Sequence, residues 1–133
     1  MGSSYVTHAA GYVDNGGPKL VTSRFGYEDS HTLARFEATS GYMGLKAAMA
    51  KRPAEVHSQV REATLLGRGG AGFPAGVKWG FCPEGVWPRY LVVNGDESAP
   101  GTYKDRLLME RDPHQLIEGL PHRLHELGTR LVR

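Results

Sequence analysis

The sequence is short of cysteine, of long apolar runs and of net charge. A single cysteine, Cys82, allows no internal disulfide and cannot supply the several thiolates of an iron–sulfur cluster. The net charge is only +2 and no block of Lys or Arg occurs, which argues against nucleic-acid binding. No apolar run approaches the roughly 20 residues that cross a bilayer. These absences predict a cytoplasmic protein without direct membrane insertion.

The length of 133 residues fits one domain, and the composition changes along it. Residues 1–28 are rich in Gly, Ser, Asn and Tyr, which predicts an irregular N-terminal arm. Residues 29–119 carry the periodic apolar patterns of a folded part. Residues 120–133 form a C-terminal tail compatible with a helix, whose apolar stripe would be Leu120, Leu124, Leu127 and Leu131. His122 and His125 in this tail are expected to be ordinary surface histidines.

The folded part begins with a predicted helical region. Asp29 or Ser30 is expected to cap a helix over residues 31–39, which would bury Leu33 and Phe36. Further helices are predicted over residues 42–50 and 53–66. Pro53 suits the first turn of the latter, where its missing N–H costs nothing.

The second half of the folded part alternates strand and helix signals. Residues 89–94, "RYLVVN", have the β-branched and aromatic content of a buried strand. Helices are predicted over residues 103–111 and again from Asp112-Pro113, an N-cap followed by proline. The sequence therefore predicts an α/β fold with a helical N-terminal region.

The stretch "LLGRGGAGFPAGVKWGF", residues 65–81, is dense in glycine. Gly67, Gly69 and Gly72 satisfy G-x-G-x-x-G, but this pattern needs a strand before it and a helix after it. A predicted helix precedes the stretch, and Pro74 with Gly76 opposes an immediate helix after it. An ordinary Rossmann phosphate loop is therefore not expected.

The side chains within the stretch still suit a ligand. Glycine lets backbone N–H groups point at an anion or lets a flat ring approach closely. Arg68 and Lys78 supply positive charge, and Phe73 and Phe81 offer faces for stacking. The same pattern is equally typical of a tight connection whose cations are solvated, so the residues alone leave both interpretations open.

A polar turn, "NGDES" at residues 94–98, follows the predicted strand. Ligands bind at the carboxyl ends of strands in α/β sheets, and Asn94, Asp96 and Glu97 would stand there. Their amide and carboxylate groups can hold ribityl or ribose hydroxyls. The alternative is a turn stabilised by its own Asn and Asp side chains that leads into a helix, which is common for Asn-Gly-Asp.

The segments "GRGGAGFPAGVKW" and "YLVVNGDESAPGTYKDRLLMERDPHQLIEG" resemble the NADH-binding flavin subunit of respiratory complex I, the F-type or 51-kDa subunit. The resemblance runs from about residue 21 to residue 119. It implies a partial Rossmann-like FMN/NADH-binding domain, with residues 29–119 as its N-terminal part. It implies that the cofactor-binding residues are Gly67, Arg68, Gly69, Gly70, Gly72, Phe73, Lys78, Phe81, Asn94, Asp96 and Glu97.

The resemblance also implies a reaction and partners. Members transfer a hydride from NADH to FMN and pass electrons to iron–sulfur clusters, towards quinone. The implied partners are other peripheral-arm subunits, especially the 24-kDa (E-type) one, in a complex peripheral to the cytoplasmic membrane. Diaphorase subunits of NAD-linked hydrogenases and formate dehydrogenases share these motifs. A non-catalytic, truncated nucleotide-binding fragment is the other alternative.

Two departures from the family pattern are visible. Ala99 stands where the family usually has a glutamate that contacts NADH, so we expect weaker NADH binding. After Gly119 the sequence departs from the family and stops, as expected for a truncated or frame-shifted product or a cropped sequence. The cysteine ligands of the family's 4Fe-4S cluster are also absent from this chain. The isolated chain is therefore expected to be inactive.

Overall fold

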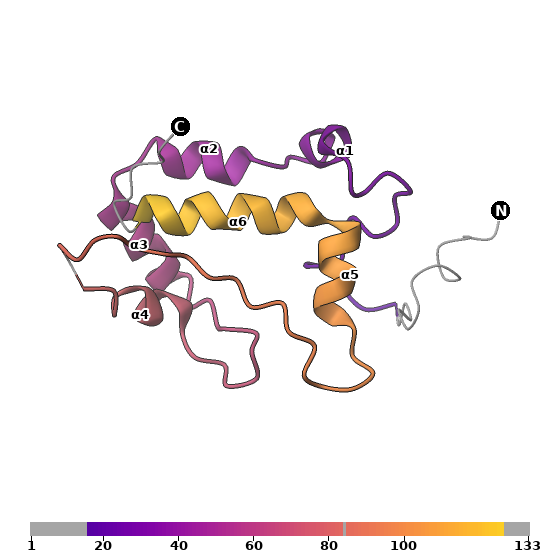
Figure 1. Ribbon diagram of the computed structural model, residues 1–133. Helices are drawn as coiled ribbons and strands as arrows, with labels where there is room; N and C mark the ends of the chain where they lie inside the picture. Colours follow the sequence, from indigo (N-terminus) through magenta and orange to yellow (C-terminus); the bar gives the residue numbers. More distant parts are fainter. Residues whose placement is uncertain (1–15, 84, 127–133) are drawn as a thin grey trace. The chain divides into compact units, whose positions relative to one another are not determined.

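The computed structural model describes residues 16–83 and 85–126, excluding the side chains of residues 122–126. This part of the chain is rich in helix (Figure 1). Its elements, in order, are α1 (Leu33–Ala38), α2 (Met43–Met49), α3 (Pro53–Glu62), α4 (Ala75–Trp79), α5 (Lys104–Arg111) and α6 (Pro113–Glu126). The described ranges contain no strand, only an isolated antiparallel bridge between Leu66 and Pro74.

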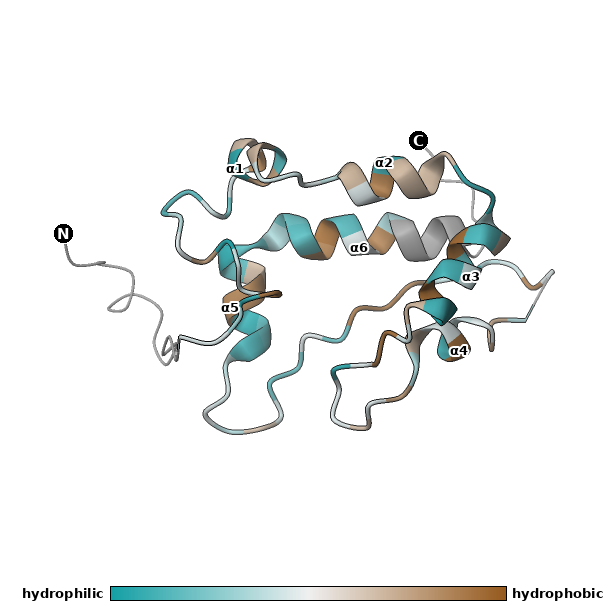
Figure 2. Ribbon diagram, turned by 180° about the vertical axis from the view of Figure 1, so that it is seen from behind, coloured by the Kyte–Doolittle hydropathy of each residue, from teal (hydrophilic) through white to brown (hydrophobic). Residues whose placement is uncertain are grey.

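The predicted buried strand over residues 89–94 is wrong for this structure. The segment is irregular, and Tyr90 and Val92 are 81% and 86% exposed. Hydrophobic residues lie along this stretch between α4 and α5 (Figure 2). A strand needs a neighbour to pair its N–H and C=O groups, and the one β-bridge among the described residues joins Leu66 to Pro74, outside this segment. The α/β Rossmann-like arrangement is therefore not confirmed.

The first predicted helix is confirmed as α1, but its cap is different. Thr32 is the N-cap, and its Oγ1 accepts from the N–H of Arg35 at 3.2 Å. The carboxylate of Asp29 instead accepts from Arg35 Nε at 2.9 Å. Phe36 is fully buried as predicted, whereas Leu33 is 48% exposed because the short helix buries only one residue.

The helix predicted from Pro53 is confirmed as α3, with Pro53 in its first turn. It ends at Glu62, four residues earlier than predicted. Thr64 has a φ of 50°, in the left-handed region, so the backbone leaves the helical path there. Val56 is buried, whereas Ala63 lies outside the helix and is exposed.

The later helices begin as the sequence predicts. Helix α5 lies within predicted residues 103–111, and α6 begins at Pro113. Helix α6 continues through Pro121 to Glu126. The predicted stripe at Leu124, Leu127 and Leu131 and the expected exposure of His122 and His125 lie outside the described side chains. No helix within the described ranges has both the length and the apolar character needed to cross a membrane.

The chain divides into two compact units. Unit 1 consists of residues 1–42 and 93–118, and unit 2 of residues 43–92 and 119–133. In unit 1, Phe25 and Phe36 are buried, and the fully buried carboxylate of Asp112 accepts from Arg24 Nε at 2.7 Å. In unit 2, Ala48 and Val56 are buried and α3 packs against α4.

Candidate functional site

The glycine loop, residues 67–73, is closed at its base by backbone hydrogen bonds within unit 2. The N–H of Gly67 donates to the carbonyl of Phe73 at 2.8 Å. Just outside it, the N–H of Ala75 donates to the carbonyl of Leu65, also at 2.8 Å. The loop follows α3 and leads directly into α4 (Figure 1). Its two arms are therefore held together while its tip is free to meet a ligand.

The helix that follows the glycine loop corrects a sequence prediction. Pro74 and Gly76 oppose a helix here by their residue type, yet α4 begins at Ala75 with Pro74 as its N-cap. Proline is tolerated at a helix start because the first N–H groups have no helical partner. Gly76 is buried, and a Cβ there would lie 2.7 Å from Arg61 Cα. Glycine therefore permits α4 to pack closely on α3.

The glycines inside the loop differ in what the fold requires of them. Gly70 and Gly72 have φ values of 100° and 64°, which favour glycine. Gly69 has no left-handed φ, and a Cβ added there would meet nothing within 4 Å. Neither backbone conformation nor packing within the described residues explains glycine at position 69. The N–H groups of Gly69, Gly70 and Gly72 also donate to no described residue.

Two cations accompany the glycine loop. Arg68 lies within it and Lys78 in the last turn of α4, and both are exposed. Within the described part of the chain, neither side chain makes a hydrogen bond or an ion pair. They are therefore available to an anion.

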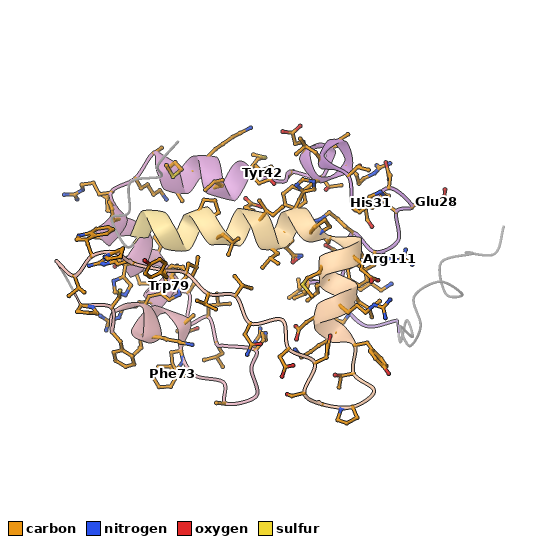
Figure 3. All side chains as sticks on the ribbon, in the orientation of Figure 1. Glu28, His31, Tyr42, Phe73, Trp79 and Arg111 are labelled. Carbon is orange, nitrogen blue, oxygen red and sulfur yellow. The ribbon has the colours of Figure 1, made fainter. Side chains whose placement is uncertain are left out.

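An aromatic pair lies at the exit of the glycine loop. The Phe73 and Phe81 ring centroids are 5.9 Å apart, with their planes inclined by 49°. Phe73 is 45% exposed and Phe81 68% exposed. Figure 3 shows Phe73 beside α4. The structure thus brings these two predicted site residues into contact, within the same unit as the glycine loop.

The polar turn, in unit 1, is largely occupied by its own hydrogen bonds. Asn94 Oδ1 accepts from the N–H of Asp96 at 2.8 Å. Glu97 Oε1 accepts from the N–H groups of Asp105 and Arg106 at 2.6 and 2.8 Å. Glu97 therefore caps the start of α5, as in the alternative interpretation of this turn. Asp96 is exposed, and its carboxylate has no partner among the described residues.

An apolar hollow of about 250 Å³ lies beside the polar turn within unit 1. Its lining includes Val93, Asn94, Gly95, Leu108, Met109 and Leu116. A Cβ at Gly95 would lie 3.3 Å from Met109 Cε, so glycine here accommodates the methionine side chain. The hollow has no cation in its lining, which suits an apolar group better than a phosphate.

Ala99 and Cys82 lie outside these clusters of contacts. Ala99 is exposed, and its carbonyl accepts from Thr102 Oγ1 at 2.9 Å. Cys82 is a half-buried free thiol. Within residues 16–83 and 85–126, no three His, Cys, Asp or Glu side chains gather as metal ligands would.

Two residues that position the glycine loop were missed from the sequence. His57 on α3 has its Nε2 2.7 Å from the carbonyl oxygen of Gly76 on α4. Gly76 itself allows the close approach of the two helices. His57 and Gly76 are 19 residues apart in the sequence, and no periodic pattern links positions at that distance.

Comparison with known proteins gives consistent matches. Residues 60–132 match the family described as the Nuo51 FMN-binding domain. The NADH-quinone oxidoreductase F 2 subunit of Rhizobium meliloti is 51% identical over 103 residues, covering 76% of this chain and 24% of that protein. The F subunit of Aquifex aeolicus is 49% identical over 99 residues, covering 74% and 23%. The F subunit of Streptomyces coelicolor is 52% identical over 102 residues, covering 75% and 23%.

The chain thus spans about a quarter of the length of the curated relatives that it matches. The matched family region begins in α3 and includes both the glycine loop and the polar turn. It continues to residue 132, although the sequence predicts a departure from the family after Gly119.

Proposed function

The chain belongs to the Nuo51 FMN-binding domain family, and from this premise we propose that its glycine loop binds the FMN of an NADH-oxidising flavin subunit. The proposed reaction is that of NADH-quinone oxidoreductase: a hydride passes from NADH to FMN, and electrons leave singly for iron–sulfur clusters. FMN, when bound, supplies this change from two-electron to one-electron chemistry. This chain would bind and orient it.

The free groups of unit 2 fit a flavin phosphate. The unpaired N–H groups of the glycine loop can point at phosphate oxygens, and Arg68 and Lys78 can neutralise their charge. Phe73 and Phe81 offer exposed faces to a flat ring. We propose Gly69, Gly70 and Gly72 as the backbone part of this cradle, with Gly67, whose N–H donates to the Phe73 carbonyl, closing its base.

We also propose that three residues of the polar turn contact the flavin: Asn94, Asp96 and Glu97. Among them, the exposed carboxylate of Asp96 has no partner in the described part of the chain and can accept from a ribityl hydroxyl. The oxygens of Glu97 already accept from α5 and Thr102, so its contribution would be to hold the polar turn in shape.

The names of the relatives support the proposed setting. Each is a subunit of an NADH-quinone oxidoreductase, so we propose that this chain acts within a complex I-like assembly. Its neighbours would be peripheral-arm subunits, especially the 24-kDa type, at the cytoplasmic membrane. Residues 1–133 hold one cysteine, so the acceptor clusters would be bound outside this stretch of sequence.

Gly69 is the observation that carries the proposal. The fold gives no reason for glycine at this exposed position, whereas a closely approaching phosphate or ring does. A methyl group added at Gly69 should therefore obstruct the ligand without disturbing the protein. Gly26 in unit 1 is a matched control, because a Cβ there also meets nothing within 4 Å.

The test is to titrate FMN into the chain and into its Gly69→Ala and Gly26→Ala variants, following flavin fluorescence and amide NMR shifts. We expect a dissociation constant on the order of 1 mM, because one loop encloses little of the ligand. Gly69→Ala should weaken binding at least about tenfold, which is 1.4 kcal/mol, with an unchanged melting temperature. Gly26→Ala should change neither quantity. Equal FMN affinity in both variants, or no response of the loop amides to FMN, would contradict the proposal.

A further inference from the structure

His57 joins α3 to both ends of α4 within unit 2. Its Nε2 lies 2.7 Å from the Gly76 carbonyl oxygen, in the first turn of α4. At the other end, its Cε1 lies 3.3 Å from the place that a Cβ on Gly80 would occupy. Gly80 is the C-cap of the helix. One imidazole ring therefore bonds to the start of a five-residue helix and lies beside its end.

The hydrogen bond from His57 goes to the carbonyl of Gly76, which does not accept from the N–H four residues later. In a continued α-helix, the N–H of Gly80 would donate to the carbonyl of Gly76. Here it donates to the carbonyl of Val77 at 3.1 Å instead. A carbonyl can only accept, so Nε2 of His57 must carry the proton of this hydrogen bond.

The position of α4 bears directly on the glycine loop. The N–H of Ala75, the first residue of α4, closes the base of the loop by donating to Leu65. Lys78, the cation on α4, follows Gly76 by two residues. A shift of α4 away from α3 would therefore open the loop and displace Lys78 together.

We propose that His57 is a positioning residue for the glycine-loop site. It holds the Gly76 carbonyl, and through α4 it fixes the second arm of the loop and the place of Lys78. The binding of FMN by this loop rests on the proposed function. The role of His57 in holding α4 and the loop is independent of that function.

Hydrogen–deuterium exchange separates this role from general stabilisation. In His57→Leu, the hydrogen-bonded amides within residues 67–80, those of Gly67, Ala75, Lys78 and Gly80, should exchange about 2- to 10-fold faster, the effect of losing one hydrogen bond. Amides of α1 and α5 should keep their rates. His57→Gln should restore slow exchange, because the glutamine amide nitrogen can donate from a similar place. His31→Leu is the matched control, since His31 is exposed and makes no hydrogen bond with described residues.

A second variant guards against a failure of His57→Leu to fold. Gly76→Ala keeps the imidazole but forces α4 from α3, because its Cβ would meet Arg61. It should raise exchange over the same residues. Unchanged exchange over residues 67–80 in a folded His57→Leu, or no recovery in His57→Gln, would overturn the proposal.

FMN titration of the same proteins distinguishes the two proposals. If the chain binds FMN, His57→Leu should weaken binding about 2- to 10-fold and His57→Gln should restore it. Faster exchange with unaltered FMN affinity would overturn the positioning role at the ligand site. If the unaltered chain binds no FMN at all, the proposed function fails, while the exchange data still decide whether His57 holds the loop.

Discussion

The glycine loop of unit 2 and the polar turn of unit 1 differ in how their polar side chains are used. The two cations of the loop region, Arg68 and Lys78, have no partner within the described residues. In the turn, Asn94 and Glu97 accept hydrogen bonds from residues of their own unit. The glycines follow the same contrast. A Cβ added at Gly69 in the loop would enter open space, whereas a Cβ added at Gly95 in the turn would meet the Met109 side chain. The loop therefore leaves its two cations without partners among the described residues, whereas the turn bonds to itself through Asn94 and to the start of α5 through Glu97.

The charges of the two units differ in the same sense. Unit 2 carries more Lys and Arg than Asp and Glu, whereas carboxylates outnumber cations in unit 1. A phosphate is attracted by the former composition and repelled by the latter. The phosphate end of a flavin is thus expected at the glycine loop.

The largest expected effect concerns the buried ion pair of unit 1, between Arg24 and Asp112. Asp112 is fully buried, and Arg24 Nε binds its Oδ2 while the guanidinium lies 4.5 Å from the Phe36 ring centroid. Arg24→Ala would leave a buried carboxylate without its cation, so we expect a loss of about 3 kcal/mol in the free energy of unfolding, measured in urea.

Arg35→Ala is the control for this variant, because Arg35 pairs with a half-exposed Asp29. It should cost much less stability than Arg24→Ala, because solvent screens an accessible pair. Equal losses of stability in the two variants would contradict a special contribution of the buried Arg24–Asp112 pair to the stability of unit 1.

The polar turn and the glycine loop can be compared directly through Glu97 and Arg68. Glu97→Ala removes the acceptor of two N–H groups at the start of α5, so it should destabilise the protein by about 1–2 kcal/mol. Arg68→Ala removes no contact within the described chain and should leave stability unchanged while weakening FMN binding. Thermal unfolding measures the first effect, and FMN titration measures the second. A reversed pattern would mean that the loop is structural and the turn is for binding.

Local signals in the sequence predicted every described helix except α4. Pro53 and the Asp112-Pro113 pair marked the starts of α3 and α6, because proline fits the first turn of a helix irrespective of distant contacts. Cap choice was harder. Asp29 and Thr32 are both good caps, and the pairing of Asp29 with Arg35 left the role to Thr32.

Features that depend on a distant neighbour were not predictable. Residues 89–94 have strand-forming side chains, but a strand also needs a pairing partner, which their own sequence does not specify. Gly76 resembles a helix breaker in the sequence because its role depends on the backbone of Arg61. The glycine loop was found because its backbone freedom and its cations are encoded within 17 consecutive residues, 65–81.

The smallest expected effects concern exposed ion pairs, one in each unit. A hydrogen bond from Arg35 lowers the pKa of Asp29 in unit 1, and one from Arg52 lowers the pKa of Glu55 in unit 2. A carboxyl with a lowered pKa in the folded state stabilises the protein above its unfolded pKa. That contribution is lost as the pH falls through the lowered pKa of each carboxyl group.

Because both pairs are exposed, salt should screen them alike. NMR titration of the two carboxyl groups should show both pKa values rising towards their ordinary range at an ionic strength of about 1 M, where the Debye length is about 3 Å. Arg35→Gln and Arg52→Gln should each raise only the pKa of its own partner. Equal behaviour would show that the units differ in how their loops use polar groups, not in the strength of their surface pairs. A lowered pKa that persisted in salt in one unit alone would assign part of the difference to its surface charges.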